Sequence, residues 1–147
     1  MKHTRELNLE LGWPTVDQAL RRLDAELEAA RKMNTPLMKL IHGYGSSGKG
    51  GRIRTASRRY LEEAAAQGRI AAYLPGERFS IFDETARRAL QQYPHLRQDR
   101  DLDGENRGVT FVFLRKLGEW KNHPVTSVTG WVCCRKSCHC EPVLTLV

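Results

Sequence analysis

A short apolar segment that runs into a glycine-rich loop constrains the fold of this chain more than any other feature. Residues 37–41 are apolar apart from Lys39, which is typical of a buried strand. Five of the nine residues from Gly43 to Gly51 are glycine, so this loop can bring backbone N–H groups close to a ligand. We expect a helix over residues 52–66, with its positive dipole end facing the loop. The segment therefore predicts a phosphate-binding site.

Cationic side chains gather at the same loop and helix. Lys49, Arg52, Arg54, Arg58 and Arg59 follow one another with no acidic residue between them. The whole chain has 147 residues and a formal net charge of +7, which favours an anionic partner such as DNA or RNA. Two alternatives remain open, because the basic helix could form only a solvated surface, or the loop could hold a small phosphorylated ligand.

Apolar periodicity before the loop predicts a βαβ unit. Residues 7–11 alternate between apolar and polar, as in a half-buried strand, and Thr15 with Gln18 forms a capping box that starts an amphipathic helix. The two flanking strands should be parallel and joined by a right-handed crossover. Glu10 and His42, which follow these strands, should then lie at the same edge of the sheet, where ligands of open α/β sheets usually bind.

The rest of the pattern predicts one domain with an inserted helix. Further strands are expected at residues 70–74 and 109–114, and a helix at 83–93. The predicted fold class is α/β, an α+β two-layer sandwich with a mixed four-stranded sheet in the order βαβαβ…β. The domain covers residues 5–116, and residues 117–147 form a flexible, cysteine-rich extension.

Three local motifs indicate other chemistry, and none is supported by its context. The loop fits most of a P-loop, but Gly50 replaces the Ser or Thr that holds Mg²⁺ in nucleotide triphosphatases. Asp99 to Gly104 copies the start of a calcium loop, but Thr110 stands where a bidentate Glu is required. The cysteines between Cys133 and Cys140 lie too close together for a typical structural zinc site. We assign no metal site.

The residues Ile41-His-Gly-Tyr-Gly45 resemble the HGxG signature of the Smr (small MutS-related) family. Residues 9–20 are similar to the family's first motif, an LDLHG stretch that runs into a T-V-x-x-A-L helix. The resemblance extends over residues 7–114, with 83–93 as an insertion. It implies the fold of the C-terminal domain of bacterial initiation factor three, nucleic-acid binding and, in several members, DNA or RNA nicking.

The chain also departs from the first motif of this family. Glu10 stands where the family has Asp, Gly12 where it has His, and Trp13 where it has Gly. The histidine and glycines of the second motif are kept as His42 and its neighbours. If hydrolysis in the family relies on the Asp–His pair, this chain keeps the phosphate-binding loop but loses one imidazole.

These observations give the hypothesis of a nucleic-acid-binding domain that holds a backbone phosphate. His42 could transfer a proton near neutral pH, and Glu10 could orient His42 or hold Mg²⁺, the only cofactor considered, and only for a nuclease. The alternative is a binding module without catalysis. Trp13 either stacks on an unpaired base or makes an ordinary hydrophobic contact. The residues predicted to contact phosphate or nucleic acid are Gly43, Gly45, Ser46, Ser47, Gly48, Lys49, Arg52, Arg54, Arg58 and Trp13.

Composition also bears on the cellular compartment of the protein. No segment approaches the apolar length of a membrane span, and residues 1–5 lack the apolar core of a signal peptide. All four cysteines lie in the extension, so no disulfide framework is indicated. We expect a cytoplasmic protein without a membrane partner. The sequence does not distinguish DNA from RNA and gives no oligomeric state.

Overall fold

A four-stranded mixed sheet forms the centre of the computed structural model, which describes residues 4–45 and 50–117. The strand order is β1-β2-β4-β3, with β1 parallel to β2 and β4 antiparallel to both of its neighbours. The predicted mixed sheet and the parallel βαβ unit are therefore confirmed. The strands are β1 (Thr4–Asn8), β2 (Leu37–Ile41), β3 (Ala72–Pro75) and β4 (Val109–Phe113).

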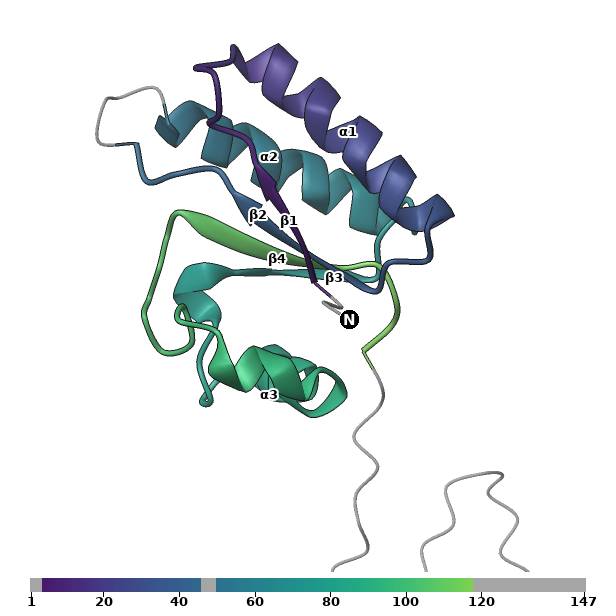
Figure 1. Cartoon of the computed structure of the whole chain (residues 1–147), viewed down its shortest axis with the longest axis vertical. Helices are drawn as coiled ribbons and strands as arrows, with labels where there is room; N and C mark the ends of the chain where they lie inside the picture. Colours follow the sequence, from purple (N-terminus) through teal and green to yellow (C-terminus); the bar gives the residue numbers. More distant parts are fainter. Residues whose placement is uncertain (1–3, 46–49, 118–147) are drawn as a thin grey trace, which may run out of the picture.

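Two long helices, α1 (Val16–Lys32) and α2 (Gly50–Ala66), cover one face of the sheet (Figure 1). The predicted capping box is present, because the Thr15 side chain accepts a hydrogen bond from the backbone of Gln18, and the Gln18 side chain accepts one from the backbone of Thr15. The apolar stripe of α1 is buried through Leu23 and similar residues. These contacts hold both helices against the sheet.

A polar cluster joins α1 and α2 at the end remote from the start of α2. The Tyr60 hydroxyl donates a hydrogen bond to Asp24, and Arg69 Nη2 lies 2.6 Å from Asp24 Oδ1 and 3.0 Å from Glu28 Oε1. Burial and the bond to Asp24 raise the pKa of Tyr60 to about 12, so the hydroxyl keeps its proton. The cluster therefore fixes the spacing of the two helices at this end.

A third layer covers the opposite face of the sheet (Figure 1). It consists of α3 (Glu84–Gln92) and the short helices η1 (Gly76–Arg78) and η2 (Pro94–Gln98). Asp83 caps α3 by accepting a hydrogen bond from the Ala86 backbone. The predicted insertion thus adds a layer to the two that the βαβαβ…β order requires, because its apolar side chains pack against the sheet face that α1 and α2 leave uncovered.

The lysine in the apolar segment is buried on this second face. Lys39 Nζ lies 2.7 Å from Asp99 Oδ1 and 2.6 Å from Asp101 Oδ2. Although burial alone would lower the pKa of Lys39, the two carboxylates raise it, so the amine stays charged. The segment that copies a calcium loop therefore neutralises a buried lysine, and the described residues contain no group of three potential metal ligands.

The sequence misplaced two strand boundaries. Residues 4–8 form β1 instead of 7–11, because pairing ends where Asn8 lies opposite Ile41, the last residue of β2. The chain then turns through Gly12 and Trp13, which have φ of 85° and 52°. Strand β3 begins two residues later than the predicted 70–74. Nearly all of the predicted C-terminal extension lies outside the described residues.

Candidate functional site

The edge of the sheet at which β1 and β2 end brings the predicted site residues together. Leu9 N donates to Ile41 O at 2.8 Å, and the backbone N–H groups of His42 and Gly43 both donate to Gly108 O, at 3.0 and 3.1 Å. The predicted placement of Glu10 and His42 at one edge is therefore confirmed. The segment before β4 also reaches this edge, which the sequence pattern did not indicate.

Glu10 lies directly against the glycine-rich loop. Gly43 and Gly45 have φ of 70° and 84°, a region that favours glycine. A Cβ atom on Gly43 would lie 1.7 Å from Glu10 Oε1, so a larger residue would require the exposed carboxylate to move. The first predicted motif and the HGxG motif are thus in contact through one carboxylate and one glycine.

His42 is fully buried beneath the loop. Its Nε2 lies 2.9 Å from Thr110 Oγ1, and its Nδ1 lies 3.2 Å from Gly43 O. Burial, together with the nearby charges of Arg58 and Arg54, lowers the pKa of His42 to about 4, so the imidazole is neutral at neutral pH. Because both ring nitrogens bond to the protein, this geometry argues against the predicted proton transfer to a ligand.

Two arginines near the start of α2 form no ion pair within the described part of the chain. Arg52 is exposed and Arg54 is half-buried, and neither has an ion-pair partner among residues 4–45 and 50–117. The first turn of α2 contains no acidic residue. Both arginines therefore belong to the beginning of α2, at the positive end of the helix dipole, which favours an anion there.

Arg58, also predicted to contact nucleic acid, is held by an acidic partner. Its Nη2 lies 2.6 Å from Glu77 Oε2, and both side chains are half-buried. Burial alone would raise the pKa of Glu77, but the hydrogen bond from Arg58 and the charges of Arg58 and Arg54 lower it. The carboxylate is therefore ionised and compensates Arg58. The sequence gave no sign of this pairing, since Glu77 belongs to a different helix.

Large apolar side chains are exposed in the loops at this edge. The exposed fractions are 84% for Trp13, 68% for Leu11 and 63% for Tyr44. Trp13 therefore does not make the buried hydrophobic contact that was the alternative to stacking. Leu11 and Tyr44 were not among the site residues predicted from the sequence, although Tyr44 occupies the variable position of HGxG. Ser46, Ser47, Gly48 and Lys49 lie outside the described residues.

Comparison with known proteins gives one likeness. No family model and no curated protein match the chain. Among solved structures, it is similar to the Smr domain of Thermus thermophilus MutS2, with 25% sequence identity and a TM-score of 0.46. The likeness covers 76% of this chain and 98% of the solved chain.

Proposed function

We propose that this domain binds nucleic acid at the sheet edge where β1 and β2 end. The observation that supports this most directly is that exposed aromatic side chains and uncompensated arginines share this edge. Trp13 and Tyr44 are exposed there, and Arg52 and Arg54 lack ion-pair partners within the described part of the chain. Proteins that bind single-stranded nucleic acid combine cations for the backbone with aromatic faces for the bases.

The start of α2 is the proposed phosphate-binding element. The first backbone N–H groups of an α-helix have no partner within the helix and, with the dipole, attract an anion, and Arg52 and Arg54 add two positive charges. The predicted contacts of residues 46–49 belong to this proposal. Net charge, basic helix and HGxG resemblance all agree with it.

We propose binding without cleavage as the principal activity. His42 is buried and neutral and Arg58 neutralises Glu77, so among residues 4–45 and 50–117 Glu10 is the available carboxylate at the loop. Mg²⁺ in phosphoryl-transfer sites usually needs one or two carboxylates as well as substrate phosphates. A nicking endonuclease is the second candidate, favoured by the position of Glu10 against Gly43, where a carboxylate could hold Mg²⁺ beside a bound phosphate.

Fluorescence anisotropy with labelled single-stranded DNA, single-stranded RNA and duplexes tests the proposal. The double variant Arg52→Ala/Arg54→Ala should bind more weakly. For a single strand, the slope of log affinity against log salt concentration should become less steep by about 1.4. Each phosphate contact contributes about 0.7 to this slope, and the variant removes two arginines. The matched control is Arg87→Ala/Arg97→Ala, which removes the same charge from exposed positions in the layer on the opposite face of the sheet.

Two results would overturn the proposal. One is the absence of salt-sensitive binding to any of these nucleic acids. The other is an equal effect of the two double variants, which would reduce the interaction to net charge. Incubation of supercoiled plasmid and structured RNA with Mg²⁺ tests the second candidate, because nicking that disappears in Glu10→Gln would establish cleavage at this edge.

A further inference from the structure

We propose that the groove between α1 and α2 receives one unpaired base of a nucleic acid bound at the start of α2. The domain would then select strands with unpaired bases over fully paired duplexes. This inference rests on the proposed function and extends it from phosphate contact to the class of nucleic acid.

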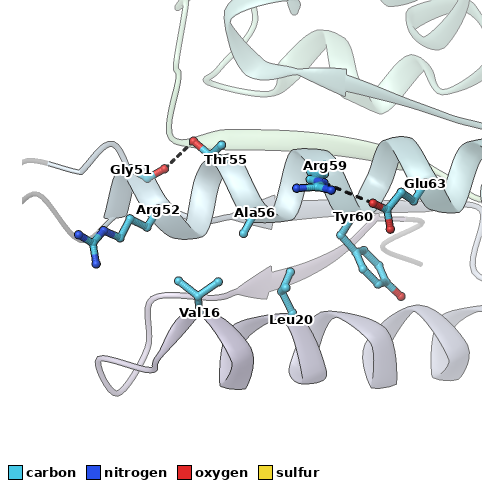
Figure 2. Close-up of a pocket in the computed structure, with 9 residues that line it drawn as sticks. All are labelled: Val16, Leu20, Gly51, Arg52, Thr55, Ala56, Arg59, Tyr60 and Glu63. Atoms are coloured by element: carbon cyan, nitrogen blue, oxygen red, sulfur yellow. Dashed lines mark hydrogen bonds and ion pairs between the residues drawn. The ribbon is translucent and has the colours of Figure 1, made fainter.

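The groove lies between the facing sides of α1 and α2 and has a volume of about 700 Å³ (Figure 2). This volume is within the range of small-molecule sites. Val16 and Leu20 point from α1 towards α2 (Figure 2). Ala56 and Tyr60 project from α2 towards α1 and form the opposite wall of the groove (Figure 2). The remaining lining residues are Gly51, Arg52, Thr55, Arg59 and Glu63.

The chemistry of the groove suits a flat apolar group. Its walls are aliphatic at Val16, Leu20 and Ala56 and aromatic at Tyr60. The Thr55 hydroxyl already donates to Gly51 O at 2.9 Å, so it requires no partner from a ligand. The Tyr60 hydroxyl is likewise occupied by Asp24. A base can bury its faces against these side chains, as bases do on aromatic and apolar surfaces in single-strand binding proteins.

The groove is continuous with the proposed phosphate site. Gly51 and Arg52 belong both to the beginning of α2 and to the groove lining. Ala56 follows Arg52 by four residues, which is about 6 Å along the helix axis. The backbone of Arg52 therefore lies about one helical turn from this wall of the groove.

The charge around the groove favours an anionic occupant. Arg59 Nε lies 3.4 Å from Glu63 Oε1, so these two charges compensate each other. Arg52 has no partner among residues 4–45 and 50–117, which leaves the lining with one net positive charge. An apolar groove with a cation at its phosphate end matches a nucleotide better than a neutral apolar peptide.

A base in a duplex cannot enter this groove without leaving its partner. Unpairing and unstacking cost a few kcal/mol per nucleotide, whereas a base in a loop or single strand is already accessible. Selection for unpaired segments therefore follows from the shape of the groove and needs no recognition of particular base edges.

The test compares an oligothymidylate with a strand of the same length in which the bases are replaced by abasic sites. Both carry the same phosphates, so their affinity ratio isolates the contribution of bases. Fluorescence anisotropy should give about tenfold tighter binding of the oligothymidylate to the unmodified protein. Ala56→Leu narrows the groove without changing charge and should lower this ratio by about threefold or more, while the affinity for the abasic strand stays unchanged. The matched control, Ala66→Leu, adds the same side chain at the exposed end of α2 and should keep the ratio.

The outcomes separate this inference from the proposed function. Equal binding of both strands overturns the groove but leaves phosphate binding intact, whereas no binding of either overturns both. A ratio that survives Ala56→Leu but is lost in Trp13→Ala places the base on Trp13 and refutes the groove. If Ala56→Leu changes the mass measured by light scattering and leaves the ratio intact, the groove contacts a second copy, and the inference is wrong.

Discussion

The buried imidazole of His42 should make folding stability depend on pH in a defined window. In the folded protein its pKa is about 4, against 6.5 when unperturbed, because burial disfavours the charged form. Below pH 6.5 the unfolded chain binds a proton that the folded protein does not bind. The stabilisation is therefore complete above this pH and is lost as the pH falls towards 4.

The size of this effect follows from the pKa difference. The shift from 6.5 to about 4 corresponds to roughly 3 kcal/mol, at about 1.36 kcal/mol per unit. About 2 kcal/mol should already be lost at about pH 5. The described aspartates with lowered pKa, such as Asp83 and Asp101, start from an ordinary value of 3.8 and titrate below this window. The loss between about pH 6.5 and 5 therefore reports mainly on histidine.

Urea denaturation at a series of pH values measures this loss. His42→Gln keeps a hydrogen-bonding side chain but has no titrating group, so its free energy of unfolding should change less over the same range. Other histidines titrate equally in both proteins, and the difference between the two slopes isolates His42. Equal slopes would refute the reasoning, and His42 would then titrate near neutral pH and return as a candidate for proton transfer.

Three further predictions concern the contacts around the site and beneath the sheet. Lys39→Met leaves the buried carboxylate of Asp101 and the partly exposed carboxylate of Asp99 without their cation. It should lower the free energy of unfolding by about 3–5 kcal/mol, measured by urea denaturation; a loss below about 1 kcal/mol would contradict the ion pairs of the buried lysine. Gly43→Ala should cost about 1–3 kcal/mol, because its φ is 70°, whereas the exposed Glu10 carboxylate can move away from the new methyl group. Adding Glu10→Ala should therefore leave this loss unchanged in thermal melts, and a recovery would show that the carboxylate is held in place. Arg58→Ala leaves Glu77 unpaired and should destabilise the fold by about 1–3 kcal/mol while the salt dependence of nucleic-acid binding stays unchanged; a shallower dependence would place Arg58 at the phosphate.

Short-range sequence patterns were sufficient to predict the helices and strands that position the candidate site. The capping box of Thr15 and the apolar run of β2 involve only near neighbours in the chain, and both were predicted correctly. The parallel pairing of β1 with β2 follows from the βαβ connection and also placed Glu10 and His42 at one edge. The sequence therefore predicted that these two residues share one edge of the sheet.

The sequence did not predict the state of the individual side chains, because this depends on distant partners. His42 is enclosed by Thr110, which lies 68 residues along the chain, and Arg58 is neutralised by Glu77, 19 residues away. A pattern of residue types shows neither contact. Lys39 was a signal from which a distant contact could have been predicted, because a lysine in a buried strand needs a carboxylate partner. Asp99 and Asp101 are these partners.

The most direct test of the central claim is the salt dependence of nucleic-acid binding in the unmodified protein and in Arg52→Ala/Arg54→Ala. The account predicts salt-sensitive binding whose slope decreases by about 1.4 in this variant and stays closer to the original in Arg87→Ala/Arg97→Ala. Identical slopes in the two double variants would contradict a phosphate site at the start of α2.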